Sequence, residues 1–128
     1  MATITILGCA YSIPNAAHEV THFAVQGEHS SILVDCGTNP TVRLAQAGIA
    51  YDSISDVILT HFHPDHVSGA PLMLMNMWLL GRKQPLRIHA PAQCLQRFNQ
   101  LMEAYDWQQW PGFFSVELHE IPLHENAP

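Results

Sequence analysis

The stretch at residues 61–66, which reads His-Phe-His-Pro-Asp-His, constrains this chain more than any other feature. It places three imidazoles and one carboxylate within six consecutive residues. Imidazole nitrogens and carboxylate oxygens are ligands that suit zinc and related divalent cations. Residues 57–60, which precede it, predict a strand, because they are apolar, rich in β-branched side chains and too few for a helix. We therefore expect a metal site at the end of a rigid strand.

The spacing within this stretch indicates how the ligands are shared. His61 and His63 are two residues apart, so in an extended backbone they project to the same side and can bind one ion together. Pro64 keeps His63 out of the helical region, and a turn into a helix after it directs Asp65 and His66 toward a second ion. The pattern favours a two-metal site over one ion that collects all four groups. In a third interpretation Asp65 only caps the following helix, which leaves three histidines at ligand spacing unexplained.

Length and charge exclude some classes of protein. At 128 residues the chain is one domain or part of one. Hydrophobic residues make up 48% and charged residues 12%, so we expect a core and some apolar surface that is covered by something else. The net charge of −6 and only five Lys and Arg residues exclude a basic face that follows phosphate backbones. For a nucleic-acid substrate, the attraction must then come from bound metals and from a segment outside this chain.

Cysteine spacing and apolar segments bear on the compartment. The three cysteines are far apart and show no zinc-finger or redox spacing, which predicts reduced thiols in a cytoplasmic protein. The start of the chain lacks the pattern of a signal peptide. The apolar segment 67–80 is too short to span a bilayer and is interrupted by Pro71 and Asn76, so no membrane partner is expected.

Residue patterning predicts three strands, followed by three helices that each precede a further strand. Asn39 and Pro40 are typical of a helix start and Gly48 of a helix end. Segment 67–80 is apolar on nearly all sides, which favours a helix in a buried layer or against a partner. A helix connects the third and fourth strands, so these are expected to be parallel. The predicted strands are 3–7, 20–25, 31–35, 57–60, 85–90 and 113–121, and the predicted helices are 40–47, 67–80 and 91–105.

Several motifs resemble the metallo-β-lactamase fold hydrolases, and within them the ribonuclease Z-like branch. His-x-His-x-Asp-His after an apolar strand looks like the superfamily signature, and residues 31–37, a strand that ends in Asp and Gly, resemble its second signature. Residues 5–14, the pattern Trp78-x-x-Gly81-Arg82 and residues 85–91 are similar to segments of ribonuclease Z and of arylsulfatase-like and phosphodiesterase-like relatives. The resemblance covers essentially the whole chain.

This resemblance implies an α/β (α+β) fold that forms the first half of a four-layer αββα sandwich. The chain, residues 1–128, is then a single incomplete domain with a mixed sheet and helices on one face. In the family, a third His for the His61/His63 metal, a bridging Asp and a last His for the Asp65/His66 metal come later. We therefore expect a truncation or fragment of a longer hydrolase, whose exposed sheet face is covered in a homodimer or by a complementing C-terminal half.

The resemblance also implies a role for each side chain of the site. His61 and His63 hold one metal ion, and Asp65 and His66 hold the other. Asp65 is also the expected catalytic residue, because it can orient the attacking hydroxide. Asp35 is expected to hydrogen-bond the metal-binding loop from behind, and so to affect metal affinity without touching metal. Two zinc ions are the default cofactor, although Mn²⁺ or Fe serves with the same ligands.

The implied function is that of a dinuclear zinc hydrolase acting on phosphodiesters or similar esters, RNA among them. Two close cations lower the pKa of a bridging water and stabilise charge on the attacked and leaving oxygens. We expect the isolated chain to bind metal weakly and to hydrolyse slowly or not at all. The alternative is a non-catalytic half-domain that binds metal structurally or acts as an assembly module. His119 and His124 are the two residues that can substitute for a missing ligand.

Overall fold

Alternating apolar and polar residues at the start of the chain form an antiparallel meander. β1 (Thr3–Gly8) pairs with β2 (His22–Gln26), which pairs with β3 (Ser31–Val34). Ala24 of β2 lies opposite Leu33 of β3, and both are fully buried, as the two-residue period of a strand requires. The computed structural model, which describes residues 1–123, thus confirms the predicted meander. The second strand begins two residues later than predicted, because Val20 forms an isolated bridge with Ala10.

The rest of the chain builds a parallel half onto β3. After each strand from β3 onward, a helical connection carries the chain back to the end of the sheet where that strand began. The strands β3, β4, β5 and β6 are therefore parallel neighbours, as predicted for the first crossover. The sheet therefore has six strands in chain order and is mixed. The elements are α1 (Thr41–Gln46), the 3₁₀ helix η1 (Tyr51–Ser53), β4 (Ile54–Ile58), α2 (Pro64–Val67), α3 (Ala70–Leu79), β5 (Leu86–Ala90), α4 (Ala92–Ala104), the 3₁₀ helix η2 (Trp107–Gln109) and β6 (Val116–Glu120).

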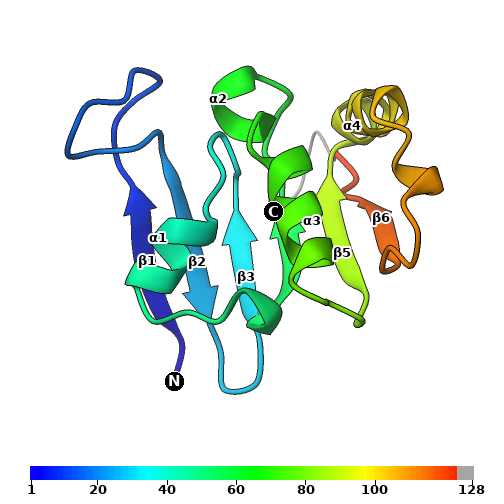
Figure 1. Ribbon diagram of the computed structural model, residues 1–128. Coiled ribbons are helices and arrows are strands. Elements are labelled where there is room, and N and C mark those ends of the chain that lie inside the picture. Colours follow the sequence, from blue (N-terminus) through cyan, green and yellow to red (C-terminus); the bar gives the residue numbers. More distant parts are fainter. Residues whose placement is uncertain (124–128) are drawn as a thin grey trace.

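Helices α1, α3 and α4 lie on one face of the sheet, as Figure 1 shows. Leu33, Val57 and Ile88, from neighbouring central strands, are buried on this face. Phe98 and Met102 of α4 are fully buried in the same cluster. Burial of this apolar surface is the main stabilising contribution to the fold. The predicted arrangement of helices on one face is confirmed.

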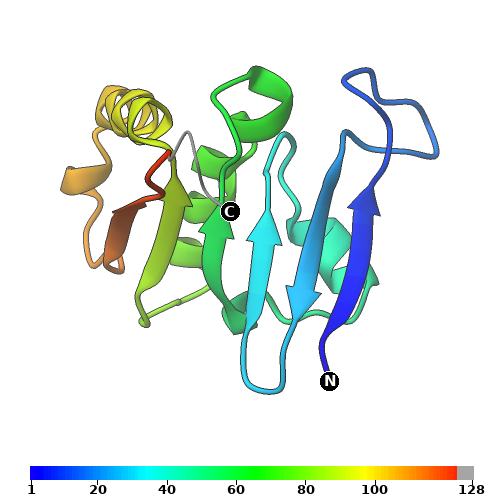
Figure 2. The same cartoon turned by 180° about the vertical axis from the view of Figure 1, so that it is seen from behind.

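The opposite face of the sheet is uncovered across residues 1–123 (Figure 2). Its β1 side is apolar, and Ile4 and Ile6 are 64% and 62% exposed. The part of this face toward β6 is polar, because Asp56 of β4 pairs with Arg87 of β5. An exposed apolar sheet face of this kind marks a surface that another element or chain covers.

The apolar segment after the motif is two helices rather than one. The helix is interrupted between α2 and α3, because the backbone N–H of Gly69 donates to the carbonyl oxygen of Cys36 at 2.8 Å instead of to a helical partner. A Cβ at Gly69 would clash with the backbone of Thr38. Helix α3 buries one face in the core, while Leu72 and Leu79 on the other are 50% and 63% exposed, so the buried-layer prediction holds for one side only. No helix in the described part of the chain is long and apolar enough to cross a membrane.

Candidate metal centre

The end of β4 fixes the direction in which the motif leaves the sheet. Leu59, which follows the strand, donates its N–H to the carbonyl oxygen of His89 at 2.9 Å. Thr60 donates its N–H to Oδ1 of Asp35 at 2.9 Å. The backbone is therefore held on both sides up to Thr60, and the chain bends at His61. The predicted strand 57–60 is thus shifted toward the N-terminus, since β4 covers Ile54–Ile58.

The second half of the motif turns into a helix, as predicted. His63 keeps an extended backbone, with φ −100° and ψ 151°, and Pro64 is the first residue of α2. Asp65 and His66 follow in the first turn, so they leave the chain in directions that differ from those of the first two histidines. The interpretation of Asp65 as a helix cap is wrong, because Asp65 lies inside α2 and makes no capping hydrogen bond.

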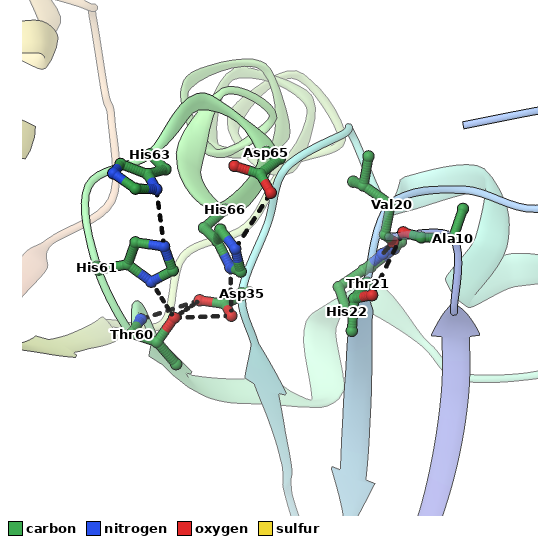
Figure 3. Close-up of polar contacts among 10 residues, drawn as sticks. All are labelled: Ala10, Val20, Thr21, His22, Asp35, Thr60, His61, His63, Asp65 and His66. Atoms are coloured by element: carbon green, nitrogen blue, oxygen red, sulfur yellow. Dashed lines mark hydrogen bonds and ion pairs between the residues drawn. The ribbon is translucent and has the colours of Figure 1, made fainter. Parts of the chain in front are cut away.

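The four polar side chains of the motif face one another (Figure 3). Nε2 of His61 lies 3.1 Å from Nδ1 of His63, and Nε2 of His66 lies 3.3 Å from Oδ2 of Asp65. The rings of His61 and His66 are 4.0 Å apart between centroids. Two ligand atoms on a tetrahedral zinc ion lie about 3.3 Å apart, given bonds of about 2.0 Å. The two pairs therefore have the spacing that zinc ligands need.

These donors are arranged as two pairs rather than as one finished cage. Within residues 1–123, no three His, Cys, Asp or Glu side chains are placed to hold an ion as they stand. His61 and His63 instead share a hydrogen bond. A cation bound by both nitrogens would replace the shared proton. The donor types and the pair spacing fit divalent metal, and the ligand roles of the four residues remain predictions.

Asp35 lies behind the motif, in the position expected of a residue that orients ligands. It directly follows β3 and is buried. Its Oδ2 accepts a hydrogen bond from Nδ1 of His66 at 2.8 Å, and both its carboxylate oxygens accept the hydroxyl of Thr60. Because Nδ1 of His66 carries the proton, Nε2 is left with its lone pair toward Asp65. The effect of Asp35 on metal affinity stays a prediction.

Thr60 is a contributor that sequence reasoning missed. Its Oγ1 lies 3.0 Å from Nδ1 of His61. Since the hydroxyl donates to Asp35, it accepts the Nδ1 proton of His61, which leaves Nε2 of that ring as an acceptor facing His63. A threonine at a strand end has no distinctive sequence signal. Only its contact with Asp35 reveals this role.

The backbone of the loop after β3 is in close contact with the backbone of α2. The N–H of Cys36 donates to the carbonyl oxygen of His66 at 2.7 Å. A Cβ on Gly37 would clash with the carbonyl oxygen of Asp65, so only glycine permits this approach. Burial raises the pKa of the Cys36 thiol, which favours its protonated form.

The other histidines of the described chain that make polar or ring contacts on the sheet lie away from the motif. His89 hydrogen-bonds Oδ1 of Asp56 at 2.7 Å on the uncovered sheet face, and the ring of His119 lies beside it, 5.2 Å away between centroids. The hydrogen bond from Arg87 holds the pKa of Asp56 well below its usual range. His22 is buried in β2 and hydrogen-bonds the carbonyl oxygen of Val20 (Figure 3). The predicted substitute ligand His124 lies outside the described residues.

Solved structures with a similar fold include human tRNase Z, short form, with a TM-score of 0.79 and 23% identity over 100% of this chain and 48% of that one. The metallo-β-lactamase fold protein YhfI from Bacillus subtilis matches with a TM-score of 0.71 and 21% identity, over 94% of this chain and 47% of that one. At these identities, both similarities show a shared fold and nothing further.

Similar sequences include two ribonuclease Z proteins. That of Methanosarcina acetivorans is 31% identical over 96% of this chain and 39% of its own length. That of Agathobacter rectalis is 35% identical over 71% of this chain and 30% of its own length. This chain therefore spans less than half of the relatives it matches.

The mixed sheet, the helices on one face and the His-x-His-x-Asp-His stretch after a parallel strand define a metallo-β-lactamase fold protein of the ribonuclease Z-like branch. Residues 2–108 match the family described as Anti-Pycsar protein Apyc1. The chain belongs to this family, and the predicted superfamily and fold class are confirmed.

Proposed function

We propose that this chain is the metal-binding half of a dinuclear zinc hydrolase that cleaves phosphodiesters, RNA among them. The observation that carries the proposal is the pairing of His61 with His63 and of Asp65 with His66 at one strand end. The similarity to ribonuclease Z sequences supports a phosphodiester substrate.

Each residue has a separate task in this proposal. His61 and His63 hold one cation, while Asp65 and His66 hold the second. Asp65 also orients the attacking water. When bound, the two cations lower the pKa of that water and stabilise negative charge on the phosphodiester. Zinc suits these ligands, and Mn²⁺ or Fe can be held by the same set.

The missing ligands must come from outside residues 1–123. A zinc ion usually takes four ligands, and the motif offers two for each ion. We propose that a complementing C-terminal half, or a second copy of the chain, covers the uncovered sheet face and completes the site. The exposure of Ile4 and Ile6 on that face supports this arrangement. His124 remains a candidate ligand, to be tested by substitution.

A reducing, cytoplasmic location fits the same picture. The cysteines at positions 9, 36 and 94 all carry free thiols. Oxidising compartments favour disulfides in small domains, so three unpaired thiols support a cytoplasmic protein.

The second candidate function is a non-catalytic half-domain that assembles with a partner. One observation favours it, namely that no three potential ligands in the described chain are placed to hold an ion as they stand. In this case the motif keeps its hydrogen bonds and binds no catalytic metal.

Zinc titration of the purified chain, with bound metal measured in equilibrium with excess free zinc, separates these functions. We expect two ions per chain, the loss of one in a His61→Ala/His63→Ala variant, and no loss in His119→Ala. Binding of one ion that disappears with any of the four side chains would show that they share a single site. Binding of none would support the assembly module. Rapid hydrolysis of bis(p-nitrophenyl) phosphate by the isolated chain would contradict an incomplete site.

A further inference from the structure

A cavity of about 600 Å³ opens beside the motif, between it and helix α4. Thr60, His61 and His63 line one side, and Gln93 and Arg97 of α4 line the other. Figure 1 shows why they meet, since α4 follows β5 and begins at the same end of the sheet as α2. A substrate whose reacting group lies at the motif therefore extends into this cavity.

Among residues 1–123, Arg97 is the one Lys or Arg side chain that lines this cavity. The protein has only five Lys and Arg residues, and others among them are already engaged. Arg82 is buried and donates to the carbonyl oxygens of Gln84 and Pro85, while Arg87 pairs with a carboxylate on the far face. Arg97 is exposed, and no ion pair to it occurs among residues 1–123. Its guanidinium is therefore available to a ligand.

We propose that Arg97 binds a phosphate group of a nucleotide in this cavity, next to the phosphodiester that is cleaved. This proposal names a substrate contact of the function proposed above and rests on it. A guanidinium presents two parallel N–H donors that match two phosphate oxygens. In a chain with a net charge of −6, the positive charge of a single guanidinium favours binding of an anionic substrate at that position. Gln93, on the same wall, offers an amide donor or acceptor to the rest of the nucleotide.

Glu120 limits what the cavity accepts. Its side chain lines the same cavity, and it forms no ion pair with Arg97 in the described chain. A carboxylate repels phosphate, so removal of its charge should strengthen binding, whereas removal of the Arg97 charge should weaken it. Comparison with a basic residue outside the cavity then distinguishes a built site from general surface charge.

The test is a titration of the zinc-free 128-residue chain with AMP, followed by NMR. We expect Arg97→Gln to weaken AMP binding about tenfold or more, because one charge-assisted contact to phosphate is lost. Glu120→Gln should strengthen it. Lys83→Gln is the matched control, because Lys83 is exposed, lies outside the cavity and loses the same charge. Adenosine, which lacks the phosphate, should bind equally to wild type and Arg97→Gln.

Equal weakening by Arg97→Gln and Lys83→Gln would overturn the proposal, as would a wild-type chain that does not bind AMP at millimolar concentrations. Zinc titration of the same variants keeps the two proposals apart. Normal zinc binding with AMP binding that is insensitive to Arg97 refutes the phosphate contact alone. AMP binding that depends on Arg97 in a chain that binds no zinc supports the contact and refutes the hydrolase function.

Discussion

Asp35 adopts a backbone conformation that few residues tolerate, with φ at 61°. Aspartate is one of the residues that enter this region at low cost. The conformation turns the carboxylate toward Thr60 and His66, whose hydrogen bonds it accepts. Strained residues of this kind cluster at functional sites. Here the conformation lets one carboxylate hold both Thr60 and His66, of which His66 is a proposed metal ligand.

Replacing Asp35 with Asn should weaken zinc binding by about tenfold or more, because the neutral amide holds the His66 tautomer less firmly. Isothermal titration with zinc measures the change. Asp106→Asn is the matched control, since Asp106 also has a positive φ, at 53°, and lies outside the motif. An Asp35→Asn chain with wild-type zinc affinity would contradict the orienting role.

His22 should make stability depend on pH. Burial lowers the pKa of His22 below its ordinary value of 6.5. The unfolded chain therefore binds a proton at a higher pH than the folded chain, so stability falls as pH drops below about 6.5. The contribution changes by at most about 1.4 kcal/mol per pH unit.

Urea unfolding at a pH above and a pH below 6.5 measures this effect. His22→Asn, which retains a donor toward the carbonyl oxygen of Val20, should flatten the decline in unfolding free energy. His29→Asn is the control, because His29 is exposed. An unchanged pH dependence in His22→Asn would show that other groups cause the decline.

At the scale of elements, the loop after β3 and helix α2 form one unit. Two backbone hydrogen bonds join them, from Cys36 to His66 and from Gly69 to Cys36. Gly37→Ala should destabilise the fold by ~3 kcal/mol, since the added methyl group overpacks a backbone contact. Chemical denaturation measures the loss. Gly27→Ala meets one tight contact, at 3.2 Å from the carbonyl oxygen of Ser30, which a small shift relieves, so it should lose much less stability than Gly37→Ala.

The order and type of the elements could be predicted, but some of their ends could not. Strand alternation and helical spacing repeat within a few residues, so they are visible in the chain itself. The break at Gly69 was missed, because it depends on the loop at Thr38, which lies far away in the sequence. The start of β4 at Ile54 was also missed, because its pairing with Ser31 decides that boundary.

At the scale of the whole molecule, the uncovered sheet face should drive association. We expect the purified chain to sediment as a dimer or larger species, because the apolar residues Ile4 and Ile6 of β1 are otherwise left in water. Ile6→Lys should weaken association about tenfold or more, since it places an unpaired charge in the contact. Val42→Lys is the control, because Val42 is 65% exposed on α1. A wild-type chain that sediments as a single monomeric species would refute this prediction.

The sequence by itself determined which donor groups the motif carries, the pairing of His61 with His63 and the succession of strands and helices, because these depend on residues close together in the chain. The tertiary structure alone decided which residues support the motif. Asp35 reaches Thr60 and His66 across 25 and 31 residues, and Arg97 joins the motif only because two parallel strands bring α2 and α4 to one end of the sheet. Contacts between residues so far apart in the sequence depend on how the layers pack, and no local pattern of residues predicts that packing.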